Sequence, residues 1–271
     1  MAEKTSTVIS QDGTAIAYER LGEGPPLILV DGALCYRASG PMRELARLLA
    51  PHFTVYLYDR RGRGESGETL PWSAGREVED LAALVEAAGG SAWLFGISSG
   101  AALALDAARD LPVPAVAVYE PPFIVDDSRT PVAPDFVPGL HACLAEGRRA
   151  ETVKRFMRLV GMPGPLVALM PVFPGWKKLT AVAHTLPYDL TLLDGTQSGR
   201  ALPRDRWSAV KQPSLVLDGG KSPRWMRRGV GALAEVLPAA RYRTLPGQNH
   251  MVKAEALAPA LVEFFAERRA S

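Results

Sequence analysis

Residues 91–100 read Ser91-Ala92-Trp93-Leu94-Phe95-Gly96-Ile97-Ser98-Ser99-Gly100, and the run Ala101-Ala102-Leu103-Ala104-Leu105 follows them directly. The apolar run before the glycine is typical of a buried strand, and the alanine- and leucine-rich run after it is typical of a helix. A G-x-S-x-G between a strand and a helix is typical of a sharp turn that exposes the central serine at the end of a sheet. The two glycines suit such a turn because the backbone packs tightly around the serine. The stretch therefore predicts that Ser98 is a nucleophile.

Apolar runs of strand length recur on both sides of this stretch, and segments with helical periodicity separate most of them. An Asp12-Gly13 turn first predicts a β-hairpin from residues 7–10 and 15–19. The later strands are expected at 27–30, 54–58, 92–95, 115–119, 214–217 and 241–245. The helices between them are expected at 41–49, 78–88 and 101–109. This alternation predicts the α/β class, with a mostly parallel, doubly wound sheet.

The interval 122–205 interrupts this alternation, because it has helix-like stretches but no strong strand signal. Helices are expected at 135–146, 150–160, 165–170 and 176–185, with proline and glycine between them. Long insertions in compact domains usually line or cover a site. We therefore predict a helical cap at 122–205, inserted into a core formed by 1–121 and 206–271.

The composition indicates a globular protein that folds on its own. Of the 271 residues 47% are apolar, and 31 basic residues against 29 acidic ones leave a net charge of +2. Because the basic residues are scattered, nucleic acid is not an expected partner, and the arginines at 60, 61 and 63 are interpreted as part of a structural glycine-rich turn. Whether the chain forms a homo-oligomer stays open.

The sequence predicts a cytoplasmic protein without a membrane span, a metal or a cofactor. Its first residues form no apolar signal core, and no apolar run approaches the length of a membrane span. Cys35 and Cys143 lie far apart without metal-ligand spacing, so reduced thiols are expected. Neither a phosphate loop nor a dinucleotide fingerprint accompanies the serine motif.

A serine nucleophile needs a base, and His250 is the best placed of the four histidines. It follows the last predicted strand and precedes a closing amphipathic helix at 254–269. His52 is expected in an exposed loop, and His141 and His184 fall in the predicted cap as packing or helix-surface residues. The residue after the nucleophile, Ser99, is expected to contribute its backbone N–H to an oxyanion hole.

Three segments, taken in chain order, resemble the α/β-hydrolase superfamily over nearly the whole chain. They are Asp59-Arg60-Arg61-Gly62-Arg63-Gly64-Glu65-Ser66, Gly96-Ile97-Ser98-Ser99-Gly100 and Gln248-Asn249-His250. The chain is most similar to capped serine hydrolases of the esterase, lactonase and perhydrolase-like type. This resemblance implies a second oxyanion donor, the backbone N–H of Ala33. Within the superfamily, Ser98 argues against a haloalkane dehalogenase and an epoxide hydrolase, since those enzymes carry aspartate at this position.

The sequence departs from the superfamily pattern at two positions. Asp31 precedes Gly32 where a histidine is usual. We interpret it as a turn carboxylate that hydrogen-bonds to loop amides, and the alternative is that its negative charge lies near the site and disfavours anionic substrates. Ser222 stands where relatives commonly carry the acid that orients the histidine. Glu120, at the end of the strand after the nucleophile helix, is the preferred substitute, and Asp218 is the alternative. The third option is no strong acid, with Ser222 as a weak partner of His250.

These observations predict a serine hydrolase that cleaves a small to medium, mainly apolar carboxylic ester, lactone or thioester through an acyl-enzyme. The apolar character of the predicted cap favours such substrates. Two other classes stay open. One is a cofactor-free lyase, cyclase or isomerase, because a fold does not determine its reaction. The other is a non-catalytic protein that binds a small ligand.

Overall fold

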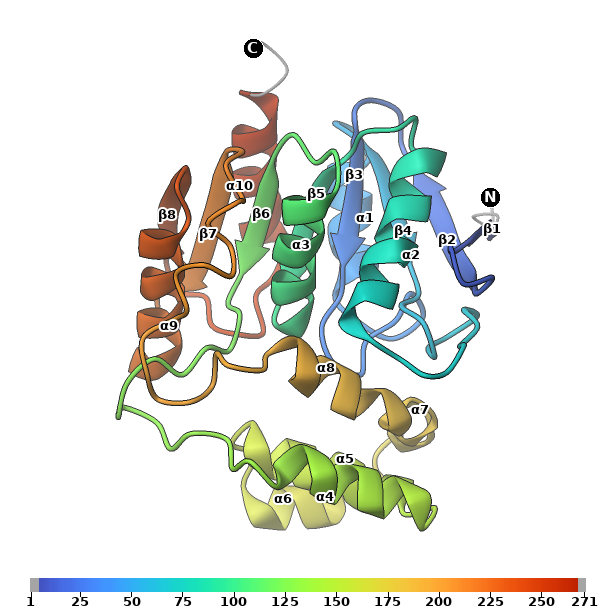
Figure 1. Cartoon of the computed structure of the whole chain (residues 1–271), viewed down its shortest axis with the longest axis vertical. Helices are drawn as coiled ribbons and strands as arrows, with labels where there is room; N and C mark the ends of the chain where they lie inside the picture. The colour runs from blue at the N-terminus through green and yellow to red at the C-terminus, as the bar shows by residue number, and fades with distance from the viewer. Residues whose placement is uncertain (1–4, 268–271) are drawn as a thin grey trace.

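A central sheet with helices on both faces forms the core of the molecule (Figure 1). The computed structural model describes residues 5–267, and within them the sheet has eight strands in the order β1-β2-β4-β3-β5-β6-β7-β8. Pairing is antiparallel for β1–β2 and β2–β4 and parallel for the rest, which confirms the predicted class and the mostly parallel sheet. The strands are β1 (Ser6–Ile9), β2 (Ala15–Leu21), β3 (Pro26–Val30), β4 (Thr54–Tyr58), β5 (Trp93–Ile97), β6 (Val116–Tyr119), β7 (Ser214–Gly219) and β8 (Ala240–Leu245).

Helices cover the two faces of the sheet and bury its strands. The face toward the viewer in Figure 1 is covered by α2 (Ala74–Ala87), α3 (Ser99–Asp110) and α9 (Arg224–Val236), and the opposite face by α1 (Met42–Leu49) and α10 (Ala254–Ala266). Each face has its own apolar cluster, so β5 is buried at all five residues and reads as a continuous apolar run. No helix within residues 5–267 is long and apolar enough to cross a membrane.

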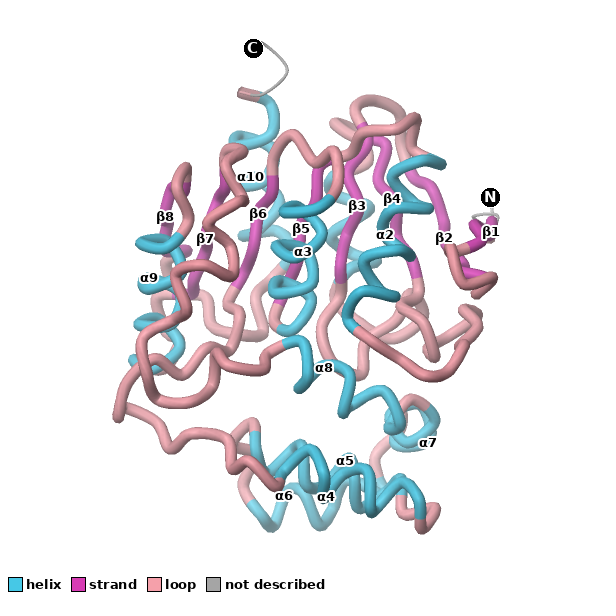
Figure 2. Tube along the Cα trace, viewed as in Figure 1, coloured by secondary structure: helices cyan, strands magenta, loops and turns pink. Residues whose placement is uncertain are grey.

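Five further α-helices lie between β6 and β7, and we call them the interposed helices. They are α4 (Phe136–Ala145), α5 (Arg149–Leu159), α6 (Gly164–Leu169), α7 (Trp176–Ala181) and α8 (Leu186–Leu192). Short 3-10 turns follow α6 and α7, at Met170–Val172 and Ala183–Thr185. The interposed helices share a small apolar cluster that includes Leu140, Val153 and Leu186, together with Leu34 from the core. A loop without helix or strand, residues 120–135, leads to them from β6 (Figure 2).

Helix α8 joins the interposed helices to the core. It contacts α3 on one side and α4 on the other, and it lies between the sheet and α4 to α6 in Figure 1. Helical periodicity does not predict α8, because a helix of seven residues with Pro187 in its first turn has little periodicity to detect. Since β3 and β5 to β8 run parallel, their carboxyl ends lie along one edge of the sheet, and the loops that follow them face α8.

Candidate active site

Ser98 occupies a strained turn between β5 and α3. Its backbone angles are φ 56° and ψ −126°, a combination that side chains rarely adopt. The neighbouring glycines are required by close contacts. A Cβ on Gly100 would lie 2.5 Å from the carbonyl oxygens of Val30 and Asp31, and one on Gly96 would lie 2.4 Å from the carbonyl oxygen of Gly100. The tight turn leaves Ser98 partly exposed, on the wall of a cavity.

Two backbone amides beside Ser98 are free to bind an oxyanion. Ala33 follows β3, and Ser99 is the first residue of α3; both line the same cavity as Ser98. Within residues 5–267 neither amide donates to another protein atom. Leu34, the residue after Ala33, has a φ of 62°, so the chain turns sharply at this point.

His250 pairs with Glu120 and not with the residues of β7. Its Nδ1 lies 3.0 Å from Oε2 of Glu120, and Oε1 of the same carboxylate accepts a 2.7 Å hydrogen bond from the N–H of Gly219. Glu120 is fully buried, and its φ of 43° turns the chain at the end of β6. The loop of His250 is itself anchored, since the Tyr119 hydroxyl donates a 2.6 Å hydrogen bond to the carbonyl of Asn249.

Asp218, the alternative acid, is engaged elsewhere. Its Oδ2 accepts hydrogen bonds from the hydroxyl of Tyr242 at 2.6 Å and from Nε of Arg227 at 3.1 Å. Asp218 lies within β7, where side chains alternate between the faces, so it shares the α9 face of the sheet with Val216. The hydroxyl of Ser222 is buried and has no hydrogen-bond partner among the described residues. The structure thus brings Glu120 to His250, and places Asp218 and Ser222 in other surroundings.

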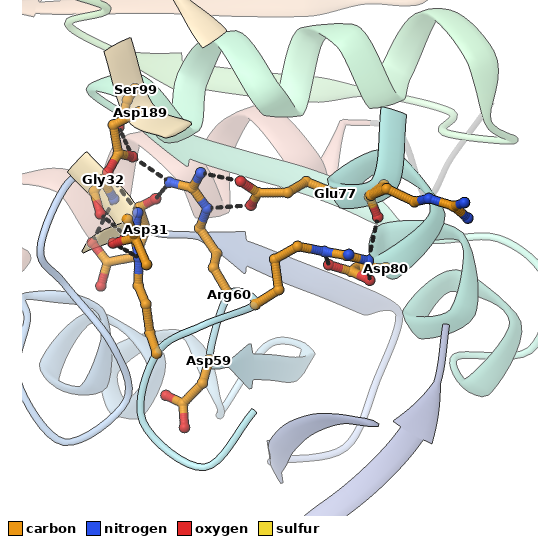
Figure 3. A network of polar contacts seen from close by, with 12 residues as sticks. Asp31, Gly32, Asp59, Arg60, Glu77, Asp80, Ser99 and Asp189 are labelled. Carbon is orange, nitrogen blue, oxygen red and sulfur yellow. Dashed lines mark hydrogen bonds and ion pairs between the residues drawn. The ribbon is translucent and has the colours of Figure 1, made fainter. Parts of the chain in front are cut away.

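A buried network of ion pairs joins Arg60, Glu77 and Asp189 beside Gly32 and Ser99 (Figure 3). The Arg60 guanidinium lies between two carboxylates: its Nε is 2.6 Å from Oε2 of Glu77, and its Nη1 is 2.7 Å from Oδ1 of Asp189. Arg63 pairs with the other oxygen of Asp189 at 2.6 Å. All four side chains are at most 3% exposed, which makes the arginine-rich turn after β4 part of the interior.

This network is bonded to the Gly32–Ala33 peptide unit and to the side chain of Ser99. Nη1 of Arg63 donates a 2.7 Å hydrogen bond to the carbonyl of Gly32, which belongs to the same peptide unit as the Ala33 N–H. Because the peptide is planar, this bond directs the N–H to the opposite side. The hydroxyl of Ser99 donates a 2.8 Å hydrogen bond to Oδ1 of Asp189. A single carboxylate on α8 therefore connects Arg63, which bonds to the Gly32–Ala33 peptide, to Ser99, which carries the other amide.

Sequence reasoning missed the roles of Asp189, Arg60 and Arg63. The ion pairs span more than 120 residues of sequence, so no local spacing predicts them. A signal was nevertheless present, since Asp189 interrupts the otherwise apolar stretch Leu186-Pro187-Tyr188-Asp189-Leu190. A charged residue at a buried position usually has a charged partner.

Asp31 forms the local contact expected of a turn carboxylate. Its Oδ1 accepts a 2.8 Å hydrogen bond from the N–H of Gly32. Burial is the main influence on its acidity and raises the pKa of Asp31 to about 7, although Arg63 and Arg60 act in the opposite direction. Its protonation state therefore changes near neutral pH, directly beside the Gly32–Ala33 peptide.

The other three histidines lie apart from Ser98. His184 is half-buried in the 3-10 turn before α8, with Nε2 3.6 Å from Glu68, and desolvation lowers its pKa. His141 is exposed on α4, and His52 lies in an exposed loop before β4. None of them lines the cavity of Ser98, whereas His250 does.

A cavity of about 180 Å³ is lined by Ser98, His250, Ala33 and Ser99. Small-molecule sites commonly measure about 300–1,000 Å³, so this one suits a short ligand. Residues of the core and of the interposed helices share its mostly apolar wall, among them Ile124, Val132, Phe156, Leu190, Leu193 and Met226. Within residues 5–267 no group of three or more histidine, cysteine or acidic side chains is arranged to hold a metal ion.

Comparison with known proteins places the chain among hydrolases. Residues 27–260 match the model of the family described as the alpha/beta hydrolase family. A pimeloyl-[acyl-carrier protein] methyl ester esterase of Xanthomonas campestris pv. campestris is 32% identical over 259 residues, covering 91% of this chain and 97% of the relative. Another esterase of this name, from Xanthomonas oryzae pv. oryzae, is 30% identical over 239 residues, or 85% of this chain and 89% of the relative. The crystal structure of an alpha/beta hydrolase from Sphaerobacter thermophilus has a TM-score of 0.88 at 53% identity, covering 96% of this chain and 100% of that one.

Proposed function

Because the chain belongs to the alpha/beta hydrolase family, we propose that it is a serine hydrolase that cleaves a carboxylic ester, lactone or thioester through an acyl-enzyme. The named esterases among its relatives support ester hydrolysis as the reaction class. One observation carries the proposed mechanism. A histidine paired at 3.0 Å with a buried glutamate lines the same cavity as a serine in a strained strand-to-helix turn.

In this mechanism Ser98 is the nucleophile, His250 the general base and Glu120 the acid that orients the base. The hydrogen bond to Glu120 requires a proton on Nδ1 of His250, which leaves Nε2 free to accept the proton of Ser98. The Ser98 oxygen attacks the acyl carbonyl, and the buried carboxylate stabilises the imidazolium that forms. Glu120 performs this task well because the N–H of Gly219 holds its second oxygen in place.

The backbone N–H groups of Ala33 and Ser99 stabilise the negative charge that develops on the carbonyl oxygen. The imidazolium then returns its proton to the leaving alcohol or thiol, and the acyl group stays on Ser98. Water, activated by His250, attacks the acyl-enzyme and releases the acid. The net reaction consumes one ester and one water and yields one acid and one alcohol, without a redox step.

The substrate we propose is small and mainly apolar. The cavity is small, and its wall is mostly formed by apolar side chains from the core and from the interposed helices. We propose that the interposed helices act as a cap, because Phe156 of α5 and Leu190 of α8 form part of this wall. Their cap role accounts for the long excursion between β6 and β7.

A fluorophosphonate probe tests for the activated serine. We expect wild-type protein and the Ser99→Ala variant to be labelled, because the proposed reaction uses only the backbone N–H of Ser99 and its hydroxyl bonds Asp189 instead, whereas the Ser98→Ala variant should not react. Methyl and p-nitrophenyl esters of short acids then test the reaction. Labelling without ester turnover would favour lyase, cyclase or isomerase chemistry, and an unlabelled wild-type protein would favour a ligand-binding role.

A further inference from the structure

Arg129 is a cation on the wall of the cavity that contains Ser98 and His250. It lies in the loop that leads from β6 to the interposed helices, and its guanidinium carbon is 4.1 Å from the centroid of the Trp225 ring. Its Nη2 donates a hydrogen bond to the carbonyl of Leu159, at the end of α5. The stacking and this bond hold the guanidinium in one place and leave its other N–H groups available.

No carboxylate of residues 5–267 forms an ion pair with Arg129. The one acidic residue that shares the cavity wall, Asp189, already pairs with Arg60 and Arg63. Asp126, three residues before Arg129, pairs with Arg228 and accepts hydrogen bonds from Ser128. Desolvation without a compensating anion lowers the pKa of Arg129, although a guanidinium stays charged at neutral pH.

A half-buried cation in a mostly apolar wall is costly unless an anion joins it. The cavity also lacks room for a large group, whereas a planar carboxylate fits the fork of a guanidinium with two parallel hydrogen bonds. We propose that Arg129 binds a carboxylate at the far end of the substrate, so that the site selects short esters that carry a second, ionised carboxyl group. This inference rests on the proposed function, because it assigns the ester end of the substrate to Ser98.

Two esters of equal chain length test this selection. Monomethyl glutarate carries the terminal carboxylate, and methyl pentanoate has a methyl group in its place; proton release reports the hydrolysis of both. We expect wild-type kcat/KM to be at least about tenfold higher for the anionic ester. Arg129→Gln should lower kcat/KM for that ester by about 10- to 100-fold, the usual effect of losing a charge-assisted hydrogen bond. The neutral ester should change by less than about threefold.

The matched control is Arg158→Gln, which removes the same charge from the exposed face of α5, where Arg158 pairs with Glu151. It should leave the preference between the two esters unchanged. Arg129→Lys retains the charge but not the fork, and it should keep part of the preference. Circular dichroism and thermal unfolding check that each variant folds.

Binding to the Ser98→Ala protein separates this inference from the proposed function, because calorimetry on this variant needs no turnover. Tighter binding of monomethyl glutarate than of methyl pentanoate, abolished by Arg129→Gln, would support the carboxylate site even if Ser98 proved not to be the nucleophile. The inference would be refuted if Ser98→Ala bound the two esters equally well, or if wild-type protein hydrolysed them at equal rates. An equal loss of kcat/KM for both esters in Arg129→Gln would also refute the inference. It would show that Arg129 has only a structural role, in which it connects α5 to Trp225.

Discussion

Ser99, which follows the proposed nucleophile, donates a hydrogen bond of 2.8 Å to Asp189 on helix α8. The bond ties the start of α3 to the interposed helices, and the same carboxylate neutralises Arg60 and Arg63. Since Arg63 also holds the carbonyl of Gly32, Asp189 stabilises the surroundings of both proposed oxyanion donors.

Asp189→Asn should destabilise the protein strongly. The substitution leaves Arg63 without a carboxylate partner in the interior, and breaking a buried pair in this way typically costs about 3–5 kcal/mol of the free energy of unfolding. Urea denaturation measures this loss. Asp194→Asn is the matched control, because Asp194 is exposed just after α8, and it should change stability by less than about 0.5 kcal/mol. Equal stability of the two variants would contradict the role of the network.

Glu120→Gln should lower kcat by about 10³- to 10⁴-fold, because a neutral amide cannot stabilise the imidazolium and favours the wrong tautomer of His250. Ester hydrolysis by purified variants measures the effect. Asp218→Asn provides the comparison, since Asp218 bonds to Tyr242 and Arg227 on the other side of β7. We expect less than about a tenfold loss there. A larger loss of kcat in Asp218→Asn than in Glu120→Gln would identify Asp218 as the acid.

Gly100→Ala should destabilise the protein by more than about 2 kcal/mol, because the new Cβ would overlap the carbonyl oxygens of Val30 and Asp31. Gly75→Ala is a matched control at the second residue of α2, as Gly100 is the second residue of α3. A Cβ on Gly75 meets nothing closer than the Ser73 hydroxyl at 3.8 Å. The free energy of unfolding of Gly75→Ala should rise by up to about 1 kcal/mol, since alanine favours the helix more than glycine does. Thermal or urea unfolding distinguishes the two outcomes.

Asp31→Asn should change how stability depends on pH. Burial raises the pKa of Asp31 from 3.8 to about 7, so between these values the folded protein keeps a proton that the unfolded chain releases. By linkage this contribution to stability is complete below about pH 4 and is lost as the pH rises to about 7. Asparagine does not titrate, so the free energy of unfolding of the variant should rise relative to that of wild type by up to about 4 kcal/mol over this interval, at about 1.4 kcal/mol per pKa unit. Parallel stability curves for the two proteins would show that Asp31 titrates normally.

Local patterns in the sequence were sufficient to predict most of the core. The G-x-S-x-G segment predicted the junction of β5 and α3 because a tight strand-to-helix turn depends on residues within a few positions of each other. The buried strands were recognisable because both of their faces are covered, which selects continuous apolar runs. The short helix α8 could not be predicted from local patterns, since its helical state depends more on packing against α3 and α4 than on its own periodicity.

The chain order by itself determined where each candidate residue lies, because residues that follow parallel strands meet at one edge of the sheet. It placed Ser98, Glu120, Asp218 and His250 near that edge but left the choice of the acid open. Only the tertiary structure decided which carboxylate meets His250, since the answer depends on side-chain direction. The backbone turn at Glu120 directs its carboxylate to the histidine, while the alternation along β7 directs Asp218 to the opposite face. Distant charges such as Arg60 and Asp189 were likewise paired by the fold alone, because the energy that joins them acts through space and leaves no spacing in the sequence.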